Sequence, residues 1–334
     1  MPAQIAVTDL SKTYRIPQRD PGLKSALRSL VRRHYSDVHA VAGVSFTVEP
    51  GEMVGFIGPN GAGKTTTLKM LSGLLYPTSG TASVAGFTPW ERKTAFLRLI
   101  TMVMGNRNQL TWENTVMDSF YVLGEIYNLP AAQFKQTLDE LVALLDIQEH
   151  LSKMARNLSL GERMKCEVAA ALLHRPQVVF LDEPTLGLDV SMQIKLRQFI
   201  ANYNRTAGAT VILTSHYMAD VVSLCPRVLL IQQGKLLFDG ELKQLAGRLA
   251  PFRQVRMELG EASPTAVDAL LVQMGSGVTV LEQSASQRVV RVRRGETSAV
   301  VSRLLHELPL ADITVEDPPI EAVIDQVYRE GMDA

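Results

Sequence analysis

Cysteine and long apolar runs are both scarce in this 334-residue sequence. The two cysteines, Cys166 and Cys225, suit a reducing compartment and do not suggest a disulfide framework. No stretch of about 18 consecutive apolar residues occurs, so the sequence predicts no membrane-spanning helix. The start, MPAQIAVTDLSKTY, lacks a charged segment followed by an apolar run, so no signal peptide is expected. Any membrane association therefore has to come through a partner or a surface-lying segment.

An excess of charge is missing as well. Lys plus Arg and Asp plus Glu each number 34, so the net charge is zero and no overall attraction to nucleic acid is expected. Internal repeats and low-complexity tracts are absent from the sequence. What remains is an ordinary globular composition, 46% apolar and 20% charged, long enough for one large domain and a small one.

A glycine-rich segment, GPNGAGKTT, lies between a strand candidate, MVGFIG, and a helix candidate, TTTLKMLSGLL. The spacing matches a phosphate-binding loop in the strand–loop–helix context that this motif needs. A plain glycine turn is the alternative. In a phosphate loop, Lys64 places its positive charge at the β- and γ-phosphates, and Thr65 offers its hydroxyl to Mg²⁺. The predicted nucleotide-binding residues are Gly58, Pro59, Asn60, Gly61, Ala62, Gly63, Lys64, Thr65 and Thr66.

Two carboxylates close a second apolar strand candidate, VVFLDE. The carboxyl ends of buried parallel strands are where open α/β sheets bind ligands. Asp182 is therefore predicted to hold Mg²⁺, usually through water, and Glu183 to polarise an attacking water. Solvated residues at a strand exit are the alternative, which is stronger for Glu183 because adjacency alone does not fix its direction.

The pentad LSLGE precedes that strand by about twenty residues. Ser159 followed three residues later by Glu162 is the pattern of a capping box, so a helix is predicted to begin there. The first turn of such a helix offers free N–H groups to an anion.

Five segments in this order, GPNGAGKTT, LSLGE, VVFLDEPT, LGLD and a histidine after TVILTS, resemble the nucleotide-binding subunit of an ABC transporter. The resemblance covers residues 3 to about 245. It implies an α/β P-loop NTPase domain at 1–245, with a RecA-like α/β core, an antiparallel β subdomain and a helical subdomain at about 107–172. Residues 246–334 alternate strand and helix patterns and are predicted to form a small accessory or regulatory α+β domain.

The resemblance also implies an activity and partners. ATP would bind with Mg²⁺, between two copies of the chain arranged head to tail, and its hydrolysis would power a separate membrane permease, most simply for export. Lys64, Glu183 and His216 would be catalytic. Ser159, Gly161, Glu162 and Asp189 would add nucleotide contacts. The subunit would then lie at the cytoplasmic face of the inner membrane, held there by the permease, with no nucleic acid bound.

Some positions depart from the pattern or leave alternatives. Tyr14 resembles the aromatic residue that stacks on adenine, with Tyr35 as its competitor. Asn106 stands where the family has a glutamine that reaches Mg²⁺, and Gln109 could supply the amide instead. A basic insert, residues 17–38, is predicted as a loop and a helix that is either solvated or touches membrane or permease.

The insert and the VMGNRNQL stretch resemble sodium-extrusion-like and drug-resistance-like exporter subunits. A soluble ABC-type ATPase acting on ribosomes or nucleic acid is the alternative function. The single nucleotide-binding unit, the missing heptad run and the zero net charge argue against it. The basic strand RVVRVRR is predicted to be a solvated edge strand, rather than a nucleic-acid site.

Overall fold

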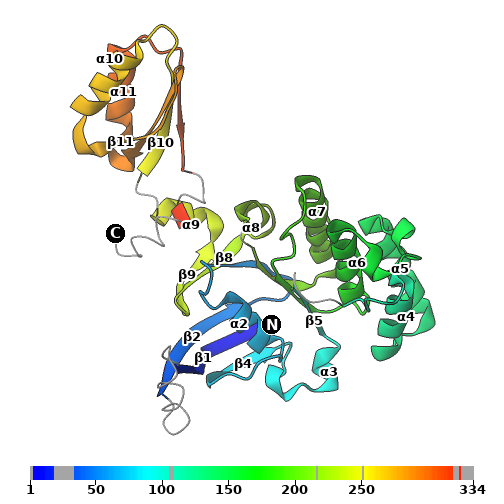
Figure 1. Cartoon of the computed structure of the whole chain (residues 1–334). Helices are drawn as coiled ribbons and strands as arrows, with labels where there is room; N and C mark the ends of the chain where they lie inside the picture. The colour runs from blue at the N-terminus through cyan, green and yellow to red at the C-terminus, as the bar shows by residue number, and fades with distance from the viewer. Residues whose placement is uncertain are drawn as a thin grey trace, which may run out of the picture. The chain divides into compact units, whose positions relative to one another are not determined.

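The computed structural model describes residues 3–18, 34–104, 109–215, 217–249, 252–318 and 323–324. The chain divides into two compact units, Met1–Gly240 and Glu241–Ala334 (Figure 1), which are described separately. The sequence places the boundary at residue 245, a few residues further along.

A largely parallel sheet forms the centre of the first unit, in the order β5-β6-β7-β3-β8-β9. Strands β5, β6, β7 and β3 are buried along their whole length, as expected for short apolar strands covered on both faces. The segment RVLLIQQGKLLFDGE predicts a hairpin with its turn at Gln233–Gly234. The structure confirms it, because this turn joins β8 to β9 and both turn residues have positive φ. The strands are β3 (Met53–Ile57), β5 (Ile100–Met104), β6 (Val178–Asp182), β7 (Thr210–Thr214), β8 (Arg227–Gln232) and β9 (Lys235–Glu241).

Three antiparallel strands form a second sheet, in the order β2-β1-β4. They are β1 (Ile5–Gln18), β2 (His34–Val48) and β4 (Ser79–Val84). The sequence pattern of residues 3–10, AQIAVTDL, predicts an edge strand. This prediction is wrong, because β4 pairs with the side of β1 that β2 leaves open. Local alternation does not encode strand order, so the sequence could not reveal this neighbour.

The predicted break at residue 17 is also wrong. Strand β1 continues to Gln18, and Pro17 pairs with Tyr35 of β2. Strand β1 pairs with β4 only from Ile5 to Ser11, so near Pro17 one side of β1 has no paired strand among the described residues. Proline has no N–H and is tolerated where that position faces the unpaired side. Residues 19–33, the middle of the predicted insert, lie outside the described residues.

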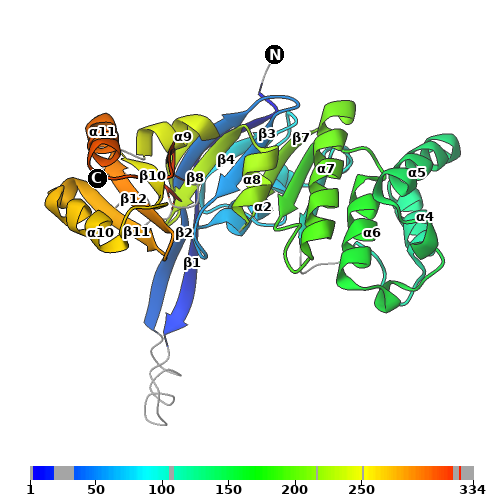
Figure 2. The same cartoon turned by 90° about the horizontal axis from the view of Figure 1, so that it is seen from above.

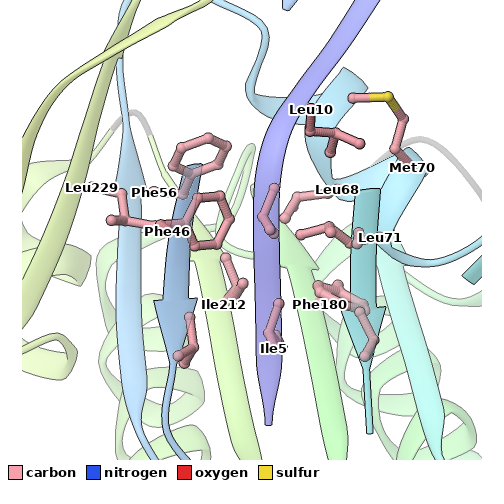
Figure 3. Close-up of a cluster of buried hydrophobic side chains, with 14 of the residues drawn as sticks. Ile5, Leu10, Phe46, Phe56, Leu68, Met70, Leu71, Phe180, Ile212 and Leu229 are labelled. Atoms are coloured by element: carbon pink, nitrogen blue, oxygen red, sulfur yellow. The ribbon is translucent and has the colours of Figure 1, made fainter. Parts of the chain in front are cut away.

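The main core lies between the two sheets (Figure 3). Ile5 and Phe46 of the antiparallel sheet face Phe56, Phe180 and Ile212 of the parallel sheet. Helix α2 (Lys64–Leu71) contributes fully buried side chains to the same cluster and contacts β2, β4 and β6. Each such aromatic or aliphatic side chain contributes about 1.5–3 kcal/mol by leaving water. The phosphate loop is thus anchored at both ends, by β3 and by α2.

Helices α4 and α5 pack beside α6 in the predicted helical subdomain (Figures 1 and 2). Helix α6 in turn contacts β5, so this subdomain joins the edge of the parallel sheet. Helices α7 and α8 contact each other, and α8 contacts β3. The helices of the unit are α2 (Lys64–Leu71), α3 (Thr94–Leu97), α4 (Val116–Ile126), α5 (Ala131–Leu145), α6 (Leu160–Leu172), α7 (Val190–Ala207) and α8 (Met218–Leu224).

The second unit is a β-α-β-β-α-β arrangement with the strand order β11-β12-β10-β13. Apolar residues of its two long helices and of the sheet share one core. The predicted edge strand RVVRVRR is wrong, because β12 lies inside the sheet and buries Arg288 in a 2.8 Å ion pair with Asp268. The elements are α9 (Leu242–Leu249), β10 (Phe252–Glu258), α10 (Pro264–Gln273), β11 (Val278–Gln283), β12 (Gln287–Arg293), α11 (Thr297–Glu307) and β13 (Asp312–Glu316).

Candidate functional site

The glycine-rich loop fits its surroundings only with glycine at key positions. Gly63, just before α2, has a φ of 108°, and a Cβ there would lie 2.4 Å from the carbonyl oxygen of Ala40. A Cβ on Gly58 would lie 2.3 Å from the carbonyl oxygen of Ile231. Neither backbone oxygen can move away cheaply. The loop is therefore fixed by steric contact with two neighbouring segments, in the way that a backbone cradle for phosphate requires.

Lys64 lies inside this loop with 6% of its surface exposed. Its Nζ donates to the carbonyl oxygens of Gly58 at 2.6 Å and Pro59 at 3.1 Å. Burial lowers the pKa of Lys64, while the carboxylates of Glu183 and Asp182 oppose that shift. The loop thus holds a cation beside two acidic groups, close to where the β- and γ-phosphates of a nucleotide would need charge compensation.

One carboxylate joins three elements at the carboxyl end of the sheet. The hydroxyl of Thr65 on α2 donates to both oxygens of Asp182, at 3.0 and 2.9 Å, and Thr214 at the end of β7 donates to Oδ1 at 2.7 Å. Within the described residues, no group of three or more His, Cys, Asp or Glu side chains could hold a metal. Oxygen donors from one carboxylate and one hydroxyl nevertheless fit Mg²⁺, which keeps waters and nucleotide phosphates as its other ligands.

Glu183 has a strained backbone. Its φ of 56° is in the left-handed region, which non-glycine residues adopt rarely. Its N–H donates to the carbonyl oxygen of Thr214 at 3.0 Å, and also lies 3.2 Å from the hydroxyl of that residue. The left-handed backbone of Glu183 follows the last residue of β6, Asp182, so the chain turns at Glu183. Strain of this kind costs about 1–3 kcal/mol and clusters at active sites.

The LSLGE segment forms the predicted capped start of α6. The N–H of Glu162 donates to Ser159 Oγ at 3.3 Å, and Glu162 Oε2 accepts from the N–H of Ser159 at 2.8 Å. These bonds confirm the capping box, and the bond from the Ser159 N–H is the main cause that lowers the pKa of Glu162. In both views α6 lies with α4 and α5, away from α2 (Figures 1 and 2).

The LGLD segment approaches this helix start. A Cβ on Gly187 would lie 2.9 Å from Leu160 Cδ2, and one on Gly161 would lie 3.4 Å from Met192. Asp189 caps α7 by accepting from the N–H of Met192 at 2.9 Å. The acidic strand and the LSLGE helix are thereby connected through residues 186–192.

The two candidate tyrosines project from the same hairpin. Tyr14 is 38% exposed and pairs with Val38, while Tyr35 is 45% exposed and pairs with Pro17. Successive strand residues alternate between faces, so residues 14 and 17 of one regular strand place the two rings on opposite faces. Tyr14 as the adenine-stacking residue stays a prediction. His216 and Asn106 lie outside the described residues, and their roles also stay predictions.

Gln109 and its surroundings contain a residue that sequence reasoning missed. The side-chain amide of Gln109 donates to the carbonyl oxygen of Met102 at 3.2 Å. Its backbone N–H donates to Glu167 on α6, as does that of Leu110. Burial raises the pKa of Glu167 to about 7. The signal available in the sequence was a carboxylate, Glu167, among the apolar residues of α6. Glu167 connects α6 to Gln109 and Leu110, which follow the predicted amide position, Asn106.

Two family sequence models match the chain. The model for "ABC transporter" matches residues 41–186, and the model for "EvrA-like ABC transporter, C-terminal domain" matches residues 251–316. The first region contains the phosphate loop, LSLGE and the acidic strand, and the second covers most of the β-α-β-β-α-β unit.

Curated relatives extend the match over most of their own length. The ABC transporter ATP-binding protein NatA of Bacillus subtilis (strain 168) is 34% identical over 62% of this chain and 84% of the relative. The linearmycin resistance ATP-binding protein LnrL of the same organism is 29% identical over 87% of this chain and 94% of the relative. The Nod factor export ATP-binding protein I of Paraburkholderia xenovorans (strain LB400) is 34% identical over 63% and 68%.

Solved structures show the same fold. An ATP-binding subunit of an ABC transporter superposes with a TM-score of 0.61 at 25% identity, over 73% of this chain and 92% of that one. An ATP-binding cassette, MJ0796, bound to ADP and phosphate as a dimer, superposes with a TM-score of 0.58 at 20% identity, over 71% and 98%. The predicted fold class, a P-loop ABC ATPase domain, is therefore confirmed. With its phosphate loop, its acidic strand and relatives of this similarity, the chain belongs to the ABC transporter family, as an ATP-binding subunit and ATPase.

Proposed function

We propose that this subunit hydrolyses ATP in composite sites shared by two copies, and that this powers export through a separate membrane permease. The observation that supports the site most directly is the hydroxyl of Thr65 bonded to Asp182. This bond joins the phosphate loop to the acidic strand, two segments that are 117 residues apart in sequence. A nucleotide bound by one segment is therefore in reach of the other.

Each group has a distinct task in the proposed reaction. Lys64 and the N–H groups of the loop bind the phosphates and stabilise the charge that spreads over the transferred group. Thr65 and Asp182 would hold Mg²⁺, which supplies further charge compensation when bound. Glu183 orients and polarises the attacking water. His216 is proposed to contact the γ-phosphate.

The remaining contacts come from a second copy. Ser159, the N-cap of α6, is exposed, and in both views this helix lies away from α2 of its own chain (Figures 1 and 2). Gly161 lies in the first turn of the same helix. A head-to-tail pair would bring this helix start to the partner's phosphate loop, where its N–H groups and dipole favour the γ-phosphate. The dimeric MJ0796 cassette has the same fold and supports this arrangement.

The relatives support a permease partner and an export direction for this chain. The names of two of them specify linearmycin resistance and Nod factor export. No helix in the described parts of this chain is long and apolar enough to span a membrane. A membrane-spanning subunit is proposed as a separate chain, and this subunit as peripheral at the cytoplasmic face.

Glu183→Gln tests the proposed site. The variant is expected to bind ATP like the unmodified chain, to lose hydrolysis by about a hundredfold or more, and to accumulate as an ATP-bound dimer. ATPase assays and light scattering with and without ATP measure both effects. Glu149→Gln, the same chemical change at an exposed position, should hydrolyse normally. Unchanged hydrolysis by Glu183→Gln would overturn the mechanism.

A further inference from the structure

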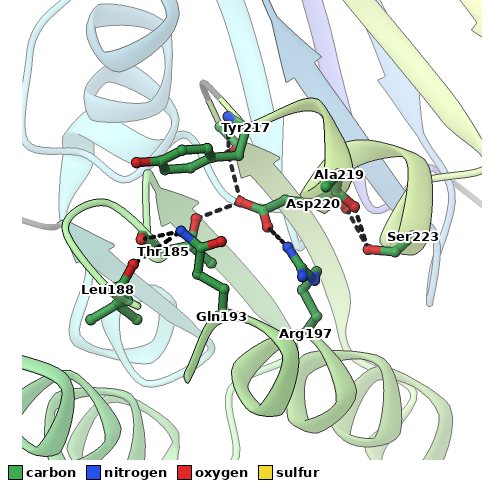
Figure 4. Close-up of polar contacts among 9 residues, drawn as sticks. Thr185, Leu188, Gln193, Arg197, Tyr217, Ala219, Asp220 and Ser223 are labelled. Carbon is green, nitrogen blue, oxygen red and sulfur yellow. Dashed lines mark hydrogen bonds and ion pairs between the residues drawn. The ribbon is translucent and has the colours of Figure 1, made fainter. Parts of the chain in front are cut away.

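A buried carboxylate outside the proposed ATP contacts joins two segments of the site. Asp220 on α8 is fully buried. Its Oδ2 accepts from the hydroxyl of Thr185, three residues after Asp182 (Figure 4). It also accepts from the hydroxyl of Ser215 at 2.6 Å. Its Oδ1 accepts from Arg197 on α7 at 2.7 Å. Both carboxylate oxygens are therefore used, and every donor comes from a different element or loop.

The two hydroxyls lie in two different loops, each shortly after the end of a strand of the parallel sheet. Thr185 is 1% exposed and follows the acidic strand β6, whereas Ser215 is 5% exposed and follows β7. Ser215 Oγ also accepts from the N–H of Tyr217 at 3.0 Å. Ser215 and Tyr217 are the direct sequence neighbours of His216, which is proposed to contact the γ-phosphate. Asp220 thus bonds to the residue before that position, and Ser215 bonds in turn to the residue after it.

The same cluster extends to the segment that leads toward the partner copy. Gln193 on α7 donates its side-chain amide to the carbonyl oxygens of Thr185 at 3.4 Å and Leu188 at 3.2 Å (Figure 4). Asp189, which follows Leu188 in the sequence, is proposed to contact nucleotide at the dimer interface. Residues 185–189 are therefore fixed at their start by Asp220 and along their length by α7.

We propose that Asp220 is a positioning residue, which keeps the segment around residue 216 in register with residues 185–189 so that γ-phosphate contact and partner contact change together. The inference rests on the proposed function of this site. A carboxylate buried with an arginine and two hydroxyl donors permits few alternative arrangements, because moving one donor leaves a carboxylate oxygen without its partner in a dry interior. The two loops then move as one body.

The hydroxyl donors give a sharper test than Asp220 itself. Removing the carboxylate would leave the partly buried Arg197 without its partner, which is expected to destabilise the domain strongly. Thr185→Val keeps the shape of the side chain and removes the donor, while Thr185→Ser keeps the donor. Ser215→Ala removes the second donor. Arg205→Gln on the exposed side of α7 serves as the matched control.

Steady-state ATP hydrolysis by the full chain measures the effect, with tryptophan fluorescence as a check that each variant is folded. Thr185→Val and Ser215→Ala are expected to lower kcat by about tenfold or more while KM for ATP changes by no more than about twofold. Thr185→Ser should recover most of the lost kcat. A purely structural cluster would instead lower thermal stability and leave the kcat of the folded fraction unchanged, which would overturn the inference.

The outcomes separate this inference from the proposed function. If the unmodified chain hydrolyses ATP, Glu183→Gln does not, and folded Thr185→Val matches the unmodified chain in kcat, only the positioning role of Asp220 fails. If Glu183→Gln hydrolyses ATP normally, the proposed site fails, and the positioning role fails with it.

Discussion

At the scale of single residues, His174 shows how burial sets protonation. Its ring stacks on Tyr127 with centroids 3.8 Å apart, and Nε2 lies 3.0 Å from the carbonyl oxygen of Ile100. Burial lowers the pKa of His174 to about 4, although the bond to Ile100 opposes the shift. The folded-state pKa is below the unfolded value of about 6.5, so protonation favours unfolding. His174 therefore contributes stability above pH 6.5 that is lost as the pH falls from about 6.5 to 4.

His174→Phe is expected to flatten this pH dependence, since phenylalanine keeps the stack on Tyr127 and does not titrate. Across the window the unmodified chain should lose up to about 3 kcal/mol more than the variant. Both tryptophans, Trp90 and Trp112, lie in the first unit, so their fluorescence during urea unfolding follows that unit alone. His306→Gln, at an exposed position of the second unit, is the control. Parallel pH profiles for His174→Phe and the unmodified chain would contradict the assignment.

The opposite dependence is expected from Glu167. Its pKa is raised to about 7 by burial, so the folded state retains a proton that the unfolded state has released. Stability from this group falls as the pH rises from about 4.5 to 7. The two windows overlap, which is why the difference between the chain and His174→Phe, rather than the whole profile, reports His174.

At the scale of elements, the start of α6 combines a structural and a proposed functional role in Ser159. As N-cap it accepts from the Glu162 N–H, and in the proposed dimer it contacts the partner's γ-phosphate. Aspartate is an equally good cap but brings a negative charge to a phosphate-facing helix start. Substitution at this residue can therefore separate the two roles.

Ser159→Asp should keep stability within a few tenths of a kcal/mol and abolish most ATP hydrolysis, because its carboxylate repels the phosphate. Ser159→Ala should cost about 1 kcal/mol of stability through the lost cap. Urea unfolding and ATPase assays on the same preparations compare these effects. A Ser159→Asp chain that hydrolyses ATP like the unmodified one would show that this helix start does not meet a nucleotide.

At the scale of the whole molecule, the proposed pairing makes each site depend on two chains. Lys64→Ala damages the phosphate loop of one site, and Ser159→Asp damages the helix start of the other. In a mixed dimer one composite site receives both damaged parts, and the other receives both intact parts. An equal mixture of the two inactive variants is therefore expected to recover about a quarter of the unmodified activity by random pairing.

Dilution tests the same pairing without mutation. Activity per chain should fall on dilution, because total activity rises more steeply than linearly with protein concentration when the active form is a dimer. A mixture as inactive as its components, together with activity that is strictly proportional to concentration, would contradict shared sites. Both measurements use the full chain, including the second unit.

The local part of the site was predictable from the sequence. The phosphate loop, the capping box at Ser159 and the hairpin turn at Gln233–Gly234 depend on neighbours within a few residues, and their steric and hydrogen-bonding requirements restrict the amino acids there. The acidic strand was predictable for the same reason. An apolar run followed by carboxylates, as in VVFLDE, indicates the end of a strand without any information on which strands pair with it.

Strand order and long-range contacts were decided only by the tertiary structure. The sequence showed neither that β4 pairs with β1 nor that β12 lies inside its sheet, because an alternating pattern fixes the faces of a strand and leaves its neighbours open. It assigned Thr65 and Asp182 to Mg²⁺, but it showed neither the direct hydrogen bond between them nor the burial of Asp220. The carboxyl ends of parallel strands lie at one edge of a sheet. Segments that are distant in the sequence therefore come together there, both at the ATP site and at the buried carboxylate of Asp220.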